Sequence, residues 1–117
     1  MKARLVDFGE LEIEGERYHK DVVINGGRIH KRDKGPSKAL PHKGSHTPLT
    51  AAEVIPWGGT RLIIGTGAKG QLPIAQEVAE EAARRGIAIE AMPTADACRL
   101  LADIDAADVY AILHVTC

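Results

Sequence analysis

The feature that most limits the possible folds is the alternation of short apolar runs with amphipathic segments after residue 60. Strands and helices are expected in turn at 61–64, 73–85, 88–92, 95–105 and 110–115. Pro73 suits the first helical turn, Gly86 suits the position after the last, and Thr94 is a candidate cap for the second helix. This order predicts a β-α-β-α-β unit with parallel strands covered by helices.

The first 32 residues predict β-structure without helices. Leu11 and Ile13 alternate with glutamates, which is the period of a half-buried strand. Asn25-Gly26-Gly27 separates the apolar run Val22–Ile24 from Arg28–Lys31, and two glycines supply the positive φ angles of a tight hairpin turn. We therefore expect a β-rich N-terminal part followed by the α/β part.

Residues 33–48 are rich in glycine and proline and are expected to form a loop. Thr50 and Glu53 have the spacing of a capping box, which predicts a short helix that begins at Thr50. The chain of 117 residues has the size of one domain. We predict a single three-layer α/β domain over 1–117, made of a β-rich part (1–32), a basic loop (33–48) and an α/β part (49–117).

The composition excludes several classes of protein. No stretch approaches the roughly 18 apolar residues of a membrane span, no secretory signal is evident, and two cysteines do not make a disulfide framework. We expect a reduced cytoplasmic protein with no membrane association. Cys98, His114 and Cys117 lack the spacing of a zinc site, so neither a metal nor another cofactor is expected.

The positive charge is concentrated between residues 28 and 46, where six basic residues stand against Asp33 alone, in a chain of net charge −1. Such a segment predicts an anionic small molecule or an acidic protein surface as partner, although a merely solvated loop has the same composition. Nucleic acid is not expected, because the segment has no aromatic residue for base stacking. The candidate interaction residues are Lys31, Arg32, Lys34, Lys38 and His46.

A glycine-rich loop follows the first strand of the α/β part: Gly65-Thr66-Gly67-Ala68-Lys69-Gly70. Such glycines let main-chain N–H groups approach an anion near a helix N-terminus, and we expect Thr94 to add a hydroxyl. Glu90 lies where a dinucleotide fold holds its ribose, but the helix expected from Pro73 begins too late for that fold, so NAD is not expected. The alternative is a purely structural turn.

His114 is the candidate for any proton transfer. It lies at the carboxyl end of the last expected strand, the edge at which open α/β sheets bind ligands. Strand alternation places His114 and Thr116 on one face. A buried, hydrogen-bonded histidine is the competing interpretation.

Several short segments resemble one known family of small α/β domains: Phe8-Gly9, Tyr18, Asp21, His46-Thr47-Pro48, Leu62–Gly67, Gly86-Ile87, Thr94, Ala97 and His114–Cys117. The family includes the animal adipogenesis-associated domain-containing protein and, more distantly, the mitochondrial assembly factor of respiratory NADH dehydrogenase. The resemblance implies a layered fold with a mixed sheet, no accepted catalytic residues, and roles in differentiation or assembly. Leu101 and Ala102 stand where many relatives carry a Tyr-Asn pair.

Two functional hypotheses remain from the sequence. The first is a weak anion or small-molecule binder at Gly65–Gly70, with no demonstrated reaction. The second is a non-enzymatic interaction or assembly module that uses the basic segment 28–46. An enzyme is the less favoured of the possibilities, because no paired catalytic groups are evident in the sequence.

Overall fold

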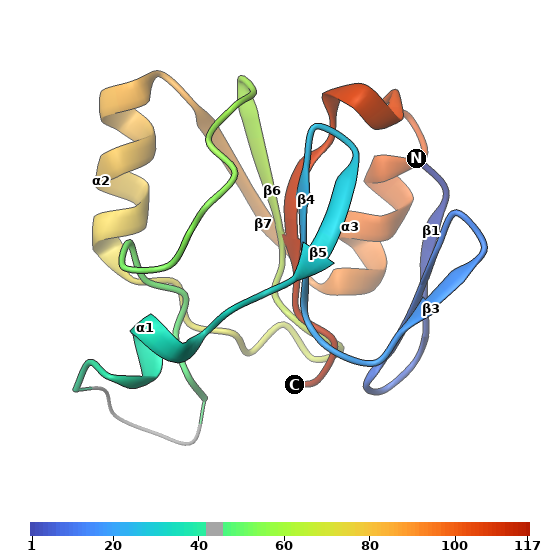
Figure 1. Ribbon diagram of the computed structural model, residues 1–117, viewed down its shortest axis with the longest axis horizontal. Helices are drawn as coiled ribbons and strands as arrows, with labels where there is room; N and C mark the ends of the chain where they lie inside the picture. Colours follow the sequence, from blue (N-terminus) through green and yellow to red (C-terminus); the bar gives the residue numbers. More distant parts are fainter. Residues whose placement is uncertain (42–45) are drawn as a thin grey trace.

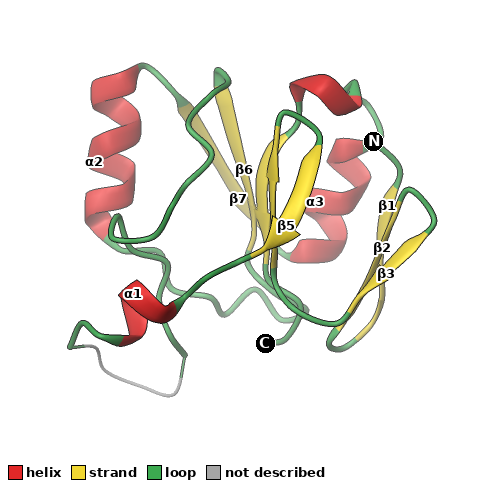
Figure 2. Cartoon of the chain, viewed as in Figure 1, coloured by secondary structure: helices red, strands yellow, loops and turns green. Residues whose placement is uncertain are grey.

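The computed structural model describes residues 1–41 and 46–117. A central sheet has α2 (Gln76–Arg85) on one side and α3 (Thr94–Leu101) on the other, and a small second sheet packs beside α3 (Figures 1 and 2). The β-rich N-terminal part is followed by β-α-β-α-β, as predicted. The three-layer α/β fold expected from the sequence is confirmed.

The small sheet is an antiparallel meander of β1 (Ala3–Asp7), β2 (Glu10–Ile13) and β3 (Glu16–Tyr18). Leu11 and Ile13 are fully buried, in agreement with their alternation with glutamates. They pack against α3 together with residues of the central sheet. The small sheet thus closes the apolar face of α3 that the central sheet leaves open.

The central sheet has the order β5-β4-β8-β6-β7 and is mixed. Its strands are β4 (Val22–Asn25), β5 (Arg28–Lys31), β6 (Arg61–Gly65), β7 (Ala88–Met92) and β8 (Tyr110–Leu113). β6 pairs in parallel with β7 and β8, whereas β4 pairs antiparallel with β5 and β8. The carboxyl ends of β6, β7 and β8 therefore meet at one edge, as the sequence predicted.

Each face of the central sheet has its own apolar cluster. Ile24, Ile63, Ala111 and Leu113 face α3 and the small sheet. Their strand neighbours Val23, Leu62, Ile64 and Ile112 face α2 and the segment that begins at Leu49. This two-sided burial explains why the strands of the α/β part read as nearly continuous apolar runs.

The turn between β4 and β5 has the predicted form. Asn25 pairs with Arg28, and the two residues between them, Gly26 and Gly27, have φ angles of 60° and 84°. Both angles lie in the left-handed region, where glycine is the favoured residue. The turn fixes the register of the hairpin, which matters for the site described below.

Four local predictions are wrong. Residues 50–53 form a turn rather than a helix, and α1 (Gly35–Lys38) lies inside the predicted loop. The first long helix begins at Gln76 instead of Pro73, because Leu49 forms an isolated parallel bridge with Ile74 and holds that segment extended. α3 ends at Leu101, and a short 3-10 helix, η1 (Ala106–Asp108), precedes β8. Lys43, counted in the basic segment, and Gly44, assigned to the predicted loop, lie outside the described residues.

None of the helices in the described part of the chain is long and apolar enough to cross a lipid bilayer.

Candidate functional site

Three polar residues form a row across the central sheet, one position beyond the last paired residues. Val22 pairs with Lys31 on one side and with Leu113 on the other, so Asp21 lies between Arg32 and His114. The main chain continues this register, because the Arg32 N–H donates to the Asp21 carbonyl at 2.8 Å and the His114 N–H to the Gly65 carbonyl at 2.9 Å. The row sits at the carboxyl ends of β6 and β8.

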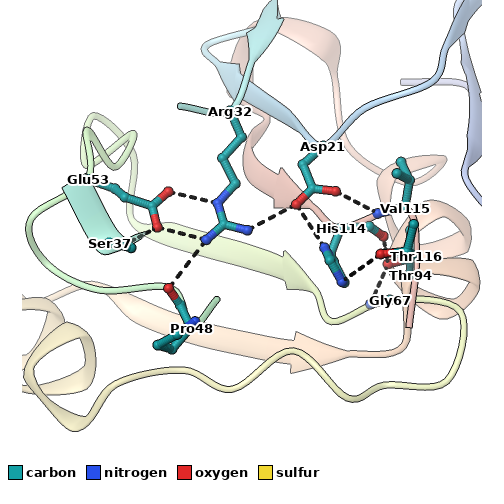
Figure 3. A network of polar contacts seen from close by, with 10 residues as sticks. All are labelled: Asp21, Arg32, Ser37, Pro48, Glu53, Gly67, Thr94, His114, Val115 and Thr116. Atoms are coloured by element: carbon teal, nitrogen blue, oxygen red, sulfur yellow. Dashed lines mark hydrogen bonds and ion pairs between the residues drawn. The ribbon is translucent and has the colours of Figure 1, made fainter. Parts of the chain in front are cut away.

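Arg32 is buried between two carboxylates (Figure 3). Its Nε and Nη2 donate to the two oxygens of Glu53, both at 2.7 Å, and its Nη1 donates to Asp21 Oδ2 at 3.0 Å. The side chains of Arg32 and Glu53 are only 1% and 2% exposed. A bidentate arginine–carboxylate pair of this kind is among the stronger charge-assisted contacts. The prediction that Arg32 is a surface residue of the basic loop is wrong.

Glu53 also accepts a hydrogen bond from a buried hydroxyl group. Ser37 Oγ donates to Glu53 Oε2 at 2.5 Å and lies 2.7 Å from Thr50 Oγ1. Ser37 belongs to α1, so this contact fastens the basic segment to the body of the protein. Thr50 and Glu53 are thus a pair of buried polar groups rather than the helix cap that their spacing predicted.

Asp21 is an ionised carboxylate with three donors around it. Burial works to raise the pKa of Asp21, but hydrogen bonds from His114, the Val115 N–H and Arg32 outweigh it and hold this pKa at about 2. Asp21 Oδ1 accepts from the Val115 N–H at 2.9 Å, and Oδ2 lies 2.8 Å from His114 Nδ1. An ionised carboxylate only accepts hydrogen bonds, so Nδ1 of His114 carries a proton.

That hydrogen bond determines what the other ring nitrogen of His114 can do. In the neutral imidazole with a proton on Nδ1, Nε2 is an acceptor. Nε2 lies 3.3 Å from Thr116 Oγ1, and in this neutral form the Thr116 hydroxyl is its donor (Figure 3). His114 itself is buried with 6% exposure, whereas Thr116 is half-buried. The predicted common face of His114 and Thr116 is confirmed by this contact.

A groove of about 620 Å³ opens over Asp21 and Arg32 and is called here the lysine groove. Its walls carry five basic and two acidic side chains, together with a histidine and the start of the last segment; the lining residues are His19, Lys20, Asp21, Lys31, Arg32, Asp33, Lys34, Gly35, Lys38, Val115 and Thr116. Three predicted interaction residues, Lys31, Lys34 and Lys38, therefore lie together on its wall. His46 is half-buried and is not among the described residues that line it.

The lysines of the groove differ from most surface arginines in ion pairing. Six surface arginines are ion-paired with carboxylates: Arg4, Arg17, Arg61, Arg84, Arg85 and Arg99. Within residues 1–41 and 46–117, no carboxylate pairs with Lys20, Lys31, Lys34 or Lys38. Arg32, the remaining cation of the lining, is already neutralised by Asp21 and Glu53. The four ammonium groups are therefore free to attract an anion from solvent.

The glycine-rich loop holds the chain itself instead of presenting its N–H groups to a ligand. Every main-chain N–H from Thr66 to Leu72 donates to an acceptor of the chain. The acceptors of residues 66 and 67 are Met92 O and Thr94 Oγ1, and those of 68, 69 and 71 are the carbonyls of Thr116, Cys117 and Cys117. The N–H groups of 70 and 72 donate to the carbonyls of Gly67 and Thr66. Gly67 has a φ of 108°, and a Cβ there would lie 2.3 Å from the Cys117 carbonyl carbon. The glycines serve close packing against the segment 116–117.

The remaining predicted loop residues do not converge on a ligand. Thr94 is fully buried, and its Oγ1 donates to the His114 carbonyl at 2.6 Å while it accepts from the Gly67 N–H. Ala68 and Lys69 are exposed, and Thr66 is buried. Glu90, considered above for a ribose, pairs with Arg61 across the sheet at 2.5 Å. The main-chain N–H groups of 66–70 and the Thr94 hydroxyl are thus bonded within the chain, and these contacts do not favour an anion site at Gly65–Gly70.

Sequence reasoning missed Asp21 and Glu53 as site residues. Asp21 could have been found from the hairpin, because the turn that pairs Asn25 with Arg28 also places Asp21 opposite Arg32. An acidic and a basic residue that face each other across a strand pair suggest an ion pair. For Glu53, which reaches Arg32 from a turn 21 positions away, no comparable signal exists in the sequence.

Comparison with known proteins supports the fold and the family. The model of the family described as "Protein of unknown function (DUF498/DUF598)" matches residues 4–114. The crystal structure of conserved hypothetical protein PH1505 from Pyrococcus horikoshii OT3 is similar over 100% of both chains, with 32% identity and a TM-score of 0.79. A solved structure titled MT938 is 25% identical, with a TM-score of 0.71, over 98% of this chain and 99% of that one. Curated proteins gave no match. The chain belongs to this family of unknown function.

Proposed function

We propose that this member of the family binds a small anionic ligand, one that carries a carboxylate or phosphate group, in the lysine groove. The observation that carries the proposal is a set of four lysines, with no carboxylate partner in the described part of the chain, around a concave site with a buried polar floor. The anion binder predicted from the sequence is retained, but we propose the lysine groove as the binding site in place of Gly65–Gly70.

The floor of the groove explains why the lysines gather at this edge of the sheet. Asp21, Arg32 and Glu53 together carry one net negative charge when His114 is neutral, and their side chains are at most 6% exposed. Negative charge in the floor draws cations to the rim. The rim cations outnumber the excess charge of the floor, so a surplus of positive charge remains for a ligand.

A second hollow in the described chain provides an internal contrast. It has a volume of about 540 Å³, lies at the opposite ends of β6 and β8, and is lined by Asp103, Asp105 and Asp108 with Arg61. Anions are repelled by such a lining. A small anion should therefore prefer the lysine groove over this hollow.

The resemblance to adipogenesis-associated and assembly proteins supports a second candidate function. Lys31 and Lys38 are exposed, so the same wall of the groove could dock an acidic protein surface without chemistry. The two candidate functions differ in the size of the anion that is sufficient for binding. A small dianion fits within a concave site of this volume, whereas a docking surface needs an extended partner.

Calorimetric titration with succinate and with inorganic phosphate tests the proposal. The test variant is Lys31→Ser with Lys34→Ser, and the matched control is Lys2→Ser with Lys69→Ser, which removes the same charge outside the groove. Two lost charges near the ligand should weaken binding about tenfold, and added salt should weaken binding to the parent.

The control variant should bind as the parent does. Equal weakening in both variants would show that only net charge matters and would refute a site in the groove. Absence of binding of either small anion to the parent at low salt would refute the small-ligand proposal in favour of a macromolecular partner or a solvated loop.

A further inference from the structure

We propose that Thr116, His114 and Asp21 form a nucleophile–base–carboxylate relay that hydrolyses carboxylic esters bearing a second, anionic group. The inference rests on the proposed function, because the lysine groove would hold that anionic group beside Thr116. None of the three residues was expected from the sequence to act with the other two.

The hydrogen bonds have the order that such a relay requires. Asp21 Oδ2 accepts from His114 Nδ1 at 2.8 Å, and His114 Nε2 faces Thr116 Oγ1 at 3.3 Å. A base within reach of a hydroxyl, itself oriented by a carboxylate, is the arrangement by which serine and threonine become nucleophiles. Asp21 is a positioning residue, because it reaches the hydroxyl only through the imidazole.

The orientation of Asp21 is itself fixed from two further directions. Its Oδ1 accepts the Val115 N–H at 2.9 Å, and its Oδ2 also accepts from Arg32 Nη1 at 3.0 Å. The buried Arg32–Glu53 pair therefore holds the carboxylate that holds the imidazole. This gives the floor of the groove a purpose beyond the stability of the fold.

Access decides which member of the relay meets a substrate. Thr116 lines the lysine groove, whereas His114 is buried with 6% exposure and is not among the lining residues described. A ligand in the groove therefore lies beside Thr116, and His114 acts on the Thr116 hydroxyl from the buried side. This arrangement favours covalent catalysis by Thr116 over direct proton transfer between His114 and the ligand.

The reaction proceeds in two balanced steps. Thr116 Oγ1 attacks the ester carbonyl carbon while its proton passes to His114 Nε2; the tetrahedral intermediate then expels the alcohol, which takes that proton, and leaves an acyl-threonine. A water molecule next attacks the acyl carbon and gives one proton to Nε2. When Thr116 leaves as the alkoxide it recovers this proton, so ester and water yield acid and alcohol. Lysines on the rim favour the negative charge that develops on the carbonyl oxygen.

The test uses mono-4-nitrophenyl succinate as the anionic probe and 4-nitrophenyl acetate as the neutral one, with the full chain. Thr116→Val removes the hydroxyl at nearly constant shape, Thr116→Ser retains it, and Thr60→Val is the matched control outside the lysine groove. The parent should release several equivalents of nitrophenolate per chain and prefer the succinate ester. Thr116→Val should lower that rate about a hundredfold, within the range of a lost nucleophile and its base.

The controls separate a catalytic role from a structural one. Thr116→Ser should retain turnover, Thr60→Val should match the parent, and peptide mass analysis after acid quenching should find the succinyl group on Thr116 of the parent. Release of a single equivalent, with acyl groups on lysines only, would overturn the inference, as would equal turnover by Thr116→Val.

Binding of succinate is measured on the same samples. If succinate binds to the parent and to Thr116→Val but neither turns over the ester, the catalytic inference fails and the proposed binding function stands. If succinate does not bind, the proposed function fails first.

Discussion

Replacing the buried Arg32 by methionine should strongly lower the free energy of unfolding. Arg32 is 2% exposed and makes three charge-assisted hydrogen bonds of 2.7–3.0 Å to Asp21 and Glu53. Methionine fills a similar volume but leaves the two buried carboxylates without their shared cation. Removal of one partner from a buried ionic network costs about 3–5 kcal/mol.

Urea unfolding at pH 7, followed by the fluorescence of Trp57 and by circular dichroism, measures this loss. Trp57 is the single tryptophan and lies under Arg85 at 5.2 Å, so its emission should change on unfolding. Lys31→Met is the matched control, because Lys31 is the adjacent residue and is exposed. Its free energy of unfolding should change by no more than about 0.5 kcal/mol.

The total stability of a domain of this kind is about 5–15 kcal/mol, so the Arg32→Met protein could unfold altogether. Failure to fold, while Lys31→Met folds, is the extreme form of the same expectation. A loss below about 1 kcal/mol would refute the reasoning, since it would mean that Asp21 and Glu53 are hydrated or protonated in the folded protein.

Three further predictions concern the groups around the site. The pKa of Asp21 is lowered from 3.8 to about 2 in the folded protein, so its ionisation contributes about 2 kcal/mol of stability above pH 4, which should be lost as the pH falls towards 2. The free energy of unfolding of Asp21→Asn should therefore depend less on pH over that range than that of the parent, and equal slopes would contradict this. Burial raises the pKa of the Cys98 thiol to about 11, so a thiol reagent at pH 8 should label half-exposed Cys117 first, and rapid labelling of Cys98 in the folded protein would contradict its burial. Gly67→Ala should destabilise the fold by about 1–3 kcal/mol and speed the labelling of Cys117, because the added Cβ would meet the Cys117 carbonyl carbon. Gly15→Ala is the control: its Cβ meets nothing within 4 Å, so it should cost only the strain of its positive φ, and equal melting temperatures for the two variants would argue against this packing.

Periodicity and turn chemistry were sufficient to predict the layers of the fold. The β-α-β-α-β order and the hairpin at Gly26 and Gly27 depend on local signals, namely apolar spacing and positive φ angles. The start of α2 could not be predicted in this way. Its delay to Gln76 comes from a main-chain bridge between Leu49 and Ile74, which are distant in sequence.

The candidate site was only partly predictable for a related reason. Lys31, Lys34 and Lys38 could be selected from charge, and His114 from its place at a strand end. The same charge pattern included Arg32, whose burial depends on Glu53 from a separate turn. The glycine-rich loop misled because glycines that approach a phosphate and glycines that approach the chain's own carbonyls look identical in a sequence.

The most direct test of the central claim is an amide chemical-shift map of the isotopically labelled protein titrated with succinate. The lysine groove predicts saturable shifts at Lys20, Lys34 and Thr116, and little change at the amides of 66–72, whose N–H groups are occupied. Saturable shifts confined to 66–72 would restore the glycine-rich loop as the anion site and contradict the account. No saturable shift at any amide would contradict it as well.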